Sequence, residues 1–321
     1  MRFFNGVNIM NEKEIMNKLK YLIKKKKSLE EIRKELNMKD YEVFGFVELL
    51  RQEGFQAAFK EGIFEVQKEQ LITERDVYQL PVGEQSKLLL ISDTHLGSKY
   101  DRLDILRYLY QRAADEGIDT VLHVGDLTDG CYPNRSNHQY ELRAHGADEQ
   151  LDYVVNKYPC QDGVKTFFIA GNHDYTHIRN DGFDIGKAVA KERSDMIYLG
   201  QDVADVKYGK TRIRLFHGSK GPSYARSYKL QKYVEQIPVE EKPQMCLMGH
   251  FHNSFYMKYS DVHCFQVPST IDQTPYARSL GLNNEKGAWL VDLTTNKQGD
   301  IITLQPEFLD FSGQKKLVRK K

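Results

Sequence analysis

The stretch LLLISDTHLG, residues 88–97, decides the fold, because an apolar run of strand length ends directly on a carboxylate and an imidazole. The pattern returns in VLHVGD, residues 121–126, and in FFIAGNHD, residues 167–174. Helical patterns over 103–114 and about 140–158 separate these strands, which indicates an α/β fold. Ligands of open α/β sheets bind at the carboxyl ends of strands. We therefore predict that the three turns converge on one site.

In the second half of the chain, the predicted strands follow one another more closely. They cover 213–216, 245–248, 255–257, 262–267 and 288–293, and the pattern predicts a second, more antiparallel sheet. His217 follows the first of these strands, and Gly249-His250-Phe251-His252 follows the second. The polar turns of both halves thus occupy the same place relative to their strands.

The polar turns carry seven side chains that offer carboxylate, imidazole or amide ligands. Such ligands suit divalent Mn, Fe or Zn better than a metal that prefers thiolates. The four cysteines are far apart, with no CxxC pair, so they indicate neither a zinc ribbon nor a disulfide framework. An isolated Asp-x-His is common at a capped turn, but the five different polar motifs, each after an apolar strand and in this order, are specific together. The candidate ligands are Asp93, His95, Asp126, Asn172, His217, His250 and His252.

Taken together, these motifs resemble those of the calcineurin-like metallophosphoesterases over about residues 87–304. The resemblance implies an α/β fold in which a β-sandwich is flanked by helices, and a hydrolase that acts on phosphoester bonds. It also implies two divalent metal ions, Mn first, with Fe or Zn as alternatives. Asp93, His95 and His252 would hold one ion; Asn172, His217 and His250 would hold the other; Asp126 would bridge both.

Two neighbouring residues are implied to be catalytic rather than metal ligands. His173 would donate to the leaving-group oxygen or to the charge developing on phosphorus, with Asp174 orienting its ring. Two metals about 3.5 to 4 Å apart can share a hydroxide and clamp the oxygens of an in-line displacement. Metal-bound imidazoles need a fixed tautomer, so we expect carbonyls or carboxylates behind the ligand histidines.

Other histidines lie outside the motifs. His177, with Arg179 beyond it, is a candidate contact to a substrate phosphate. His123 and His263 lie within apolar strands and are interpreted as packed core residues.

The N-terminal region is predicted to be a winged-helix-like α domain over 11–67. Ser28 and Glu31 form a capping box before a short helix, and a third helix begins near Asp40. Alternating apolar residues follow from 55 to 66. We predict a linker over 68–86, a phosphoesterase domain over 87–311 and a basic tail over 312–321. The exposed positions of the third helix include two acidic residues, so contact with DNA and a protein-binding or structural role stay equally open.

The substrate class is inferred from positions where the chain differs from the family's motifs and from segments that it has in addition to them. The chain reads GDLTDG over 125–130 where protein Ser/Thr phosphatases of the superfamily have Asp-Arg-Gly, which removes a phosphate clamp and argues against a phosphoprotein. SDTHLG is similar to the opening motif of SbcD-type nucleases, and lipid A pathway pyrophosphatases carry a similar string. VPSTIDQTPY, residues 267–276, is similar to a segment of the small subunit of archaeal family D DNA polymerases.

We therefore predict a phosphodiesterase that acts on DNA, as a 3′-end exonuclease or single-strand nuclease, with a replication or repair protein as a possible partner. The alternative is a phosphodiesterase or pyrophosphatase for cyclic or dinucleotide substrates, with a regulatory N-terminal domain. A third class is a DNA-binding or scaffold protein whose phosphoesterase site is secondary. A nuclease needs an open basic groove, whereas a small substrate needs a closed pocket, roofed by the insert over 130–140.

Composition limits the partners further. The 321 residues include 46 basic and 45 acidic side chains, a net charge of +1, so the chain as a whole does not attract nucleic acid electrostatically. No apolar run approaches the roughly 18 residues that cross a bilayer. The first residues include Glu12 and Glu14 and show no signal-peptide pattern, so we expect a cytoplasmic protein without a membrane partner. The oligomeric state stays open.

Overall fold

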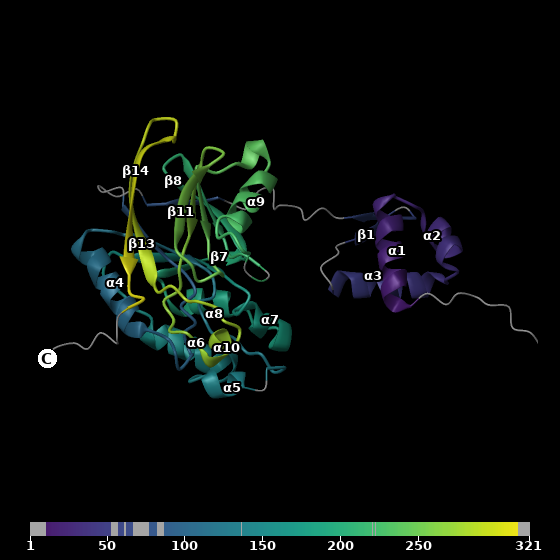
Figure 1. Ribbon diagram of the computed structural model, residues 1–321, viewed down its shortest axis with the longest axis horizontal. Coiled ribbons are helices and arrows are strands. Elements are labelled where there is room, and N and C mark those ends of the chain that lie inside the picture. The colour runs from purple at the N-terminus through teal and green to yellow at the C-terminus, as the bar shows by residue number, and fades with distance from the viewer. Residues whose placement is uncertain are drawn as a thin grey trace, which may run out of the picture. The chain divides into compact units, whose positions relative to one another are not determined.

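The computed structural model describes residues 11–52, 57–60, 62–66, 77–81, 87–135, 137–219, 221 and 223–313. The chain divides into two compact units, with the boundary after Asp76 (Figure 1). Among the described helices, none combines the length and the apolar character needed to cross a membrane. The lysines and arginine of the predicted tail, residues 315–321, lie outside the described residues.

In its described residues, the N-terminal unit contains three helices followed by a two-stranded sheet. The elements are α1 (Glu12–Lys24), α2 (Leu29–Leu36), α3 (Asp40–Gln52), β1 (Ala57–Lys60) and β2 (Ile63–Val66). The predicted capping box is present: the N–H of Glu31 donates to Ser28 Oγ at 3.2 Å, and the N–H of Ser28 donates to the Glu31 carboxylate at 2.9 Å. Leu19, Ile32 and Phe64 are fully buried in its core. The winged-helix assignment of this unit stays a prediction.

The C-terminal unit contains two six-stranded sheets. The first has the order β14-β13-β4-β5-β6-β7, and the second has the order β11-β12-β10-β9-β8-β3. The strands of the first sheet are β4 (Lys87–Ile91), β5 (Thr120–Val124), β6 (Lys165–Ala170), β7 (Met196–Gln201), β13 (Gly287–Thr295) and β14 (Ile301–Asp310). Those of the second are β3 (Tyr78–Leu80), β8 (Val203–Tyr208), β9 (Thr211–Phe216), β10 (Met245–Met248), β11 (Phe255–Tyr259) and β12 (Val262–Gln266).

The two sheets share one apolar core. Leu90 and Phe167 of the first sheet belong to the same buried cluster as Leu215 and Phe265 of the second. Burial of such side chains is the main favourable contribution to folding. The result is a β-sandwich, as the sequence predicts.

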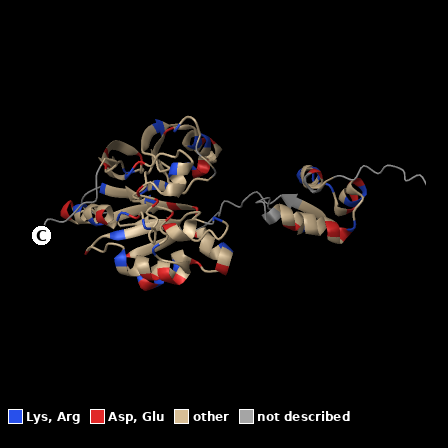
Figure 2. Ribbon diagram, turned by 60° about the horizontal axis from the view of Figure 1, so that its bottom comes forward, with Lys and Arg blue, Asp and Glu red and all other residues tan. Residues whose placement is uncertain are grey.

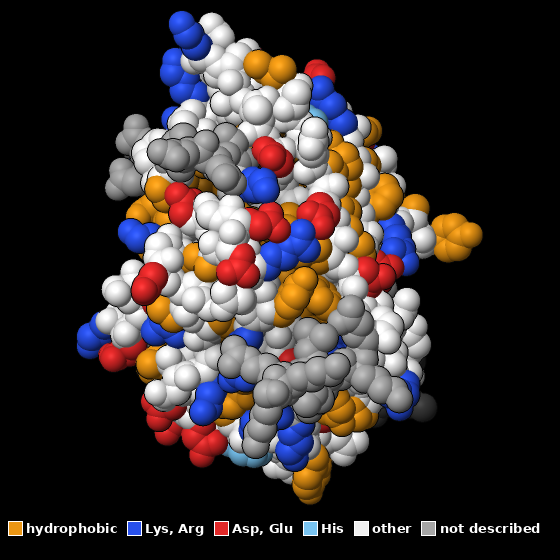
Figure 3. Space-filling model, turned by 90° about the vertical axis from the view of Figure 1, so that its left-hand side faces the viewer, with side chains coloured by type: hydrophobic (Ala, Val, Ile, Leu, Met, Phe, Trp, Pro, Cys, Tyr) orange, Lys and Arg blue, Asp and Glu red, His pale blue; other side chains and the backbone are white. Residues whose placement is uncertain are grey.

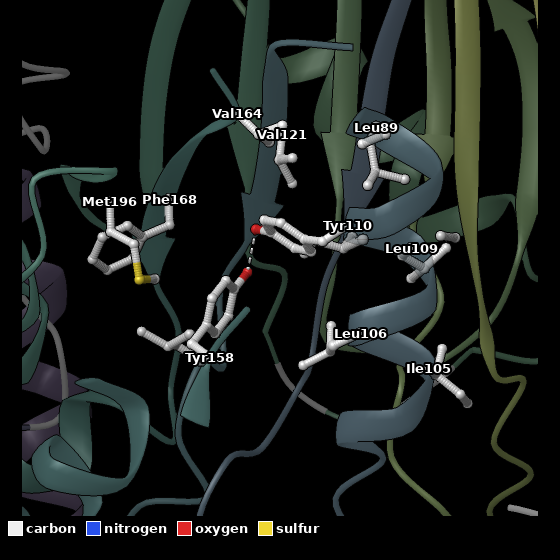
Figure 4. Packing of buried hydrophobic residues seen from close by; sticks show 14 of the residues in the cluster. Leu89, Ile105, Leu106, Leu109, Tyr110, Val121, Tyr158, Val164, Phe168 and Met196 are labelled. Carbon is white, nitrogen blue, oxygen red and sulfur yellow. Dashed lines mark hydrogen bonds between the residues drawn. The ribbon is translucent and has the colours of Figure 1, made fainter. Parts of the chain in front are cut away.

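Helices cover the outer faces of the sandwich. The main ones are α4 (Leu103–Asp115), α6 (Gly146–Lys157) and α8 (Ile185–Glu192) over the first sheet and α9 (Tyr228–Gln236) over the second. Figure 4 shows Tyr110 of α4 meeting Tyr158 among apolar side chains, and their hydroxyls are hydrogen bonded at 2.9 Å. Each helix therefore buries its apolar face against a sheet, which is typical of α/β proteins.

Short helices complete the C-terminal unit. They are α5 (His138–Glu141), α7 (Tyr175–Asp181), α10 (Pro275–Ser279) and the 3₁₀ helix η1 (Val239–Glu241). The single long helix predicted near 140–158 is replaced by α5 and α6. Gly146, at the start of α6, has a φ of +78°, a conformation that favours glycine and interrupts a continuous helix.

Sheet membership differs from the prediction in one strand. Residues 288–293 were expected in the second sheet, yet β13 pairs antiparallel with β4, with Trp289 opposite Leu90. The second sheet is also mixed, because β10 pairs in parallel with both β9 and β12. Strand patterns indicate which residues face a core but not which strand becomes the neighbour.

The segment predicted as a linker, 68–86, contains a strand in its described part. Tyr78–Leu80 form β3, which pairs in parallel with β8 at the edge of the second sheet. Leu80 is buried in the shared core of the sandwich, which accounts for the ordered pairing.

Surface charges are mixed in sign. Figure 2 shows basic and acidic residues interspersed along the helices of the C-terminal unit. On the face seen in Figure 3, acidic and basic side chains also lie next to one another. Elsewhere in the contact network, Arg112 of α4 pairs with Glu116 at 2.7 Å and with Glu307 of β14 at 2.9 Å. Such pairing neutralises basic side chains locally.

Candidate metal centre

The polar turns of both sheets meet at one edge of the sandwich. β4, β5 and β6 are parallel neighbours in the first sheet, and β9 and β10 are parallel neighbours in the second. Their carboxyl ends are tied together by backbone contacts: the N–H of Asp93 donates to Gly125 O at 2.9 Å, and the N–H of His250 donates to Asp93 Oδ2 at 2.9 Å. The convergence expected from the sequence is therefore present.

One group of ligand atoms combines Asp93, His95 and His252. His252 Nε2 lies 3.2 Å from Asp93 Oδ1 and 3.2 Å from His95 Nε2. Two imidazole nitrogens that face each other beside a carboxylate form a typical donor set for a divalent metal ion. Asp93 Oδ1 is buried and accepts no hydrogen bond from the described residues, so it has an unused lone pair aimed at this group.

A second group forms around Asp126, His217, His250 and Asn172. Asp126 Oδ2 lies 3.0 Å from His217 Nε2, and Asn172 Oδ1 lies 2.7 Å from His250 Nδ1. Asn172 Nδ2 donates to the Tyr132 hydroxyl at 3.1 Å, which directs the amide oxygen toward the histidines. Asp126 Oδ2 also lies 3.9 Å from His95 Nε2 of the first group. The two groups therefore meet at Asp126.

Electrostatics also favour a cation here. Burial lowers the pKa of His217, but the carboxylates of Asp126 and Asp93 outweigh it and raise the pKa to about 10. Burial and the carboxylates of Asp129, Asp126 and Asp93 act on His95 in the same opposed way, and its pKa rises to about 9. The buried carboxylates are thus stabilised by nearby positive charge, which divalent ions supply.

In two of the candidate ligand histidines, the ring nitrogen that does not face the ligand group contacts an oxygen atom, which fixes the ring as metal-bound imidazoles require. His95 Nδ1 lies 3.1 Å from Asp129 Oδ1, and His217 Nδ1 lies 2.7 Å from Val124 O. Sequence analysis assigned no role to Asp129 or to His138, whose Nε2 lies 3.5 Å from Asp129 Oδ2. Asp129 lies in the same polar turn as the candidate ligand Asp126, three residues later, and this position is the feature of the sequence from which its role could have been predicted.

The predicted role of Asp174 is corrected by the hydrogen bonds. Its carboxylate accepts from the backbone N–H groups of Gly171, Leu127 and Thr128 at 2.8 to 3.0 Å, and from the Thr128 hydroxyl. The His173 ring is oriented instead by Asp129, whose carbonyl oxygen lies 2.7 Å from His173 Nδ1. Sequence adjacency does not place the two side chains together, because Asp174 turns away to brace the two turns.

We expect Asp174→Ala to destabilise the fold rather than to act only on the reaction. The substitution leaves buried donors without an acceptor, at a cost of roughly 2 to 5 kcal/mol in the free energy of unfolding. The measurement is denaturant unfolding of the metal-free protein. Asp184→Ala is the matched control, because Asp184 caps α8 by accepting from Lys187 N–H and its loss costs about 1 kcal/mol. Equal losses in both variants would contradict the bracing role.

The backbone of the site is strained. Asp93, His95, Asp126, His250 and His252 all have φ between +44° and +76°, a region that non-glycine residues rarely adopt. Such conformations concentrate at functional sites, where the surrounding structure maintains them.

Glycines allow the turns to approach closely. A Cβ atom on Gly171 would collide with the carboxylate of Asp126 and lie 2.6 Å from the His217 ring. Gly171 therefore provides the space in which these two ligands meet.

A cavity of about 1060 Å³ opens over the ligand groups. The insert after β5 contributes Asn134, Arg135, Asn137, His138 and Glu141 to its lining. Ile271, Tyr276 and Leu282 are among its apolar lining residues. The cavity therefore has both polar and apolar walls beside the metal centre.

The predicted phosphate contacts do not line this cavity. His177 is fully buried, and its Nε2 lies 3.2 Å from Gln150 Oε1. Arg179 is exposed on α7 and is not among the lining residues. Helix α7 turns His177 toward the protein interior, which the sequence spacing alone did not indicate.

The two histidines interpreted as core residues differ. His123 is fully buried, with Nε2 3.1 Å from Thr94 Oγ1, and burial lowers its pKa to about 4. His263 is only partly buried and contacts the Tyr256 hydroxyl at 2.8 Å, because its strand lies near the edge of the second sheet.

Comparison with known proteins identifies related sequences. A family model described as the calcineurin-like phosphoesterase superfamily domain matches residues 87–273. Two uncharacterized metallophosphoesterases from strains of Helicobacter pylori are 25% and 27% identical over 119 residues, which is 37% of this chain. The matched part spans only 28% of the length of these relatives.

Solved structures with a similar arrangement share little sequence. An archaeal phosphodiesterase is 15% identical with a TM-score of 0.40, covering 70% of this chain and 99% of the other. A putative 5′-nucleotidase from Staphylococcus aureus is 10% identical with a TM-score of 0.42, covering 72% and 55%. A zinc complex of Vps29 from Entamoeba histolytica is 15% identical with a TM-score of 0.38, covering 70% and 99%.

Proposed function

This chain belongs to the calcineurin-like phosphoesterase superfamily, and we propose that it hydrolyses phosphodiesters with two divalent metal ions bound at the edge of its sandwich. The observation that carries the proposal is the position of Asp126 between the two groups of ligand atoms. A carboxylate shared in this way allows two cations to be held together. Mn²⁺ suits the donor set, which combines imidazole with carboxylate and amide oxygen.

The residues divide into two sets of ligands. Asp93, His95 and His252 would hold one ion, and Asn172, His217 and His250 would hold the other, with Asp126 between them. When bound, the two ions neutralise charge on the phosphoryl oxygens and lower the pKa of the attacking water. The rigid turns and the rings fixed by Asp129 and Val124 keep these ligands in place without rearrangement.

His173 is placed to serve the leaving group. Its ring lies 4.4 Å from the His95 ring, centroid to centroid, and it lines the cavity. Nδ1 is engaged by the Asp129 carbonyl, so Nε2 is the nitrogen free to exchange a proton with substrate. This is a catalytic position for a general acid.

DNA is the first candidate substrate, as the sequence motifs suggest. The N-terminal unit would then hold DNA or a replication or repair partner. A polynucleotide also requires cations along its path. Among the described lining residues, only Arg135 and Arg226 are lysine or arginine, so a DNA end would enter through few basic contacts.

A small cyclic or dinucleotide phosphodiester is the second candidate. The observation that favours it is the insert after β5, which lines the cavity as a pocket for a small substrate requires. The volume of about 1060 Å³ is ample for a nucleotide-sized ligand, since ligand pockets range from about 300 to 1,000 Å³.

Turnover in Mn²⁺ distinguishes the two candidates. We expect hydrolysis of bis(4-nitrophenyl) phosphate, a generic phosphodiester, in either case. End-labelled single- and double-stranded DNA, resolved by length, would shorten stepwise if DNA is the substrate. Intact DNA together with cleavage of cyclic or linear dinucleotides would establish the second candidate. A protein that binds metal but cleaves none of these would contradict the proposed function.

A further inference from the structure

One cation in the cavity, Arg135, has no ion-pair partner among the described residues. Arg135 is half-buried in the insert and lines the cavity together with His95, His173 and His250. In the described part of the chain, its guanidinium forms neither a hydrogen bond nor an ion pair. Arg226, which lines the same cavity, is instead paired with Glu285 at 2.5 Å. Arg226 thus has one guanidinium nitrogen engaged by Glu285, whereas no guanidinium donor of Arg135 is engaged by the described residues.

Two aromatic rings hold Arg135 in place. Its guanidinium carbon lies 3.9 Å from the centre of the Tyr132 ring and 4.4 Å from the centre of the Tyr276 ring. A cation over an aromatic ring is attracted to the ring face without using its N–H groups as hydrogen-bond donors, so the donors of Arg135 stay available for an oxyanion. Glu141 is close enough to Arg135 to interact with it electrostatically, but no hydrogen bond or ion pair joins the two side chains, and Glu141 Oε1 accepts from the Tyr276 N–H at 3.3 Å.

Tyr132 connects Arg135 to the metal centre. The same ring that stacks on Arg135 lies 4.9 Å from the His173 ring, centroid to centroid, and its hydroxyl accepts from Asn172. Arg135 is thus separated from the candidate leaving-group histidine by a single aromatic ring. That spacing suits a group adjacent to the scissile phosphate rather than the scissile phosphate itself.

We propose that Arg135 binds a second phosphate of the substrate, next to the one that is hydrolysed. The inference rests on the proposed function and narrows its substrate class to nucleotides with at least two phosphates. Arginine recognises phosphate through paired, charge-assisted hydrogen bonds. Arg135 also supplies, from the insert, the phosphate clamp that is missing from GDLTDG.

The test compares dinucleotides that differ only in a terminal phosphate. TpT, pTpT and TpTp are assayed with the full chain in Mn²⁺, and kcat/KM is measured for each. We expect the wild type to prefer at least one phosphorylated form over TpT by about 10- to 100-fold. In Arg135→Ala this preference falls to within about threefold, and in Arg135→Lys an intermediate preference remains because the charge persists without the planar fork.

Controls separate this inference from loss of the fold and from the proposed function. Metal content verifies that each variant retains its centre, and Arg143→Ala removes an arginine of the same unit that does not line the cavity, so its preference should match the wild type. A wild type without preference, or a preference retained in Arg135→Ala, overturns the role of Arg135 while bis(4-nitrophenyl) phosphate is still cleaved. Absence of that cleavage in the wild type would overturn the proposed function and, with it, this inference.

Discussion

Asp126→Asn is expected to abolish turnover and to reduce the metal content of the protein. The substitution keeps the size of the side chain and an oxygen that can accept from the backbone N–H of His173, which donates to Asp126 Oδ1 at 2.8 Å in the wild type. It removes the negative charge that the two ligand groups share. Metal ions contribute several kcal/mol of charge stabilisation to such reactions. We therefore expect a loss of at least about 10³-fold in kcat.

The measurement pairs turnover of bis(4-nitrophenyl) phosphate with metal analysis of the purified protein. His250→Ala is the companion variant, because it removes a ligand of one group only and should retain the other ion better than Asp126→Asn does. Two bound ions with full turnover in Asp126→Asn would rule out the bridging assignment. The same variant serves as the control for contaminating nuclease in DNA assays.

His173→Ala is expected to retain both ions and lose roughly 10²- to 10⁴-fold in turnover, the range for removal of a general acid. The ligand-type atoms of His173, His95 and Asp126 lie within 4.8 Å of one another, but His173 is not among the seven proposed ligands, so we expect both ions to remain. Metal content therefore distinguishes this variant from Asp126→Asn. Unchanged turnover would mean that another group protonates the leaving oxygen.

The effect of His173→Ala should also depend on pH in a defined direction. Burial lowers the pKa of His173 to about 4, although Asp126 and Asp129 oppose that shift. Because Nδ1 is engaged by a carbonyl, the ring donates from Nε2 only when it is protonated. The protonated fraction grows as the pH falls, so the ratio of wild-type to variant turnover should rise from pH 8 to pH 5. A ratio that falls over this range would contradict the acid role.

The fold could largely be predicted because the sequence repeats one local rule. Apolar strands such as 88–91 and 121–124 end on glycine-containing polar turns, and parallel strands bring such turns to one edge. The assignment of β13 to the wrong sheet has a different origin. Its pattern indicates burial on both faces, and only pairing with β4 determines to which sheet it belongs.

The site residues could be predicted where a side chain points into the site from the turn that directly follows its own strand. The seven candidate ligands lie together, because each follows directly from a strand end. The residues around them depend on contacts across the fold: Asp129 holds His95 and His173, whereas Asp174 and His177 turn into the interior. Neighbours in sequence can point to opposite sides of a turn, so spacing alone does not assign such roles.

By itself, the sequence determined the α/β class, the order of the polar turns and the chemistry of the metal ligands, since these depend on local pattern and residue type. The tertiary structure alone decided which strand joins which sheet, which carboxylate supports which imidazole, and that Arg135 lies between Tyr132 and Tyr276. Those contacts join residues far apart in the chain. They follow from packing of the two sheets and the insert, which no local pattern encodes.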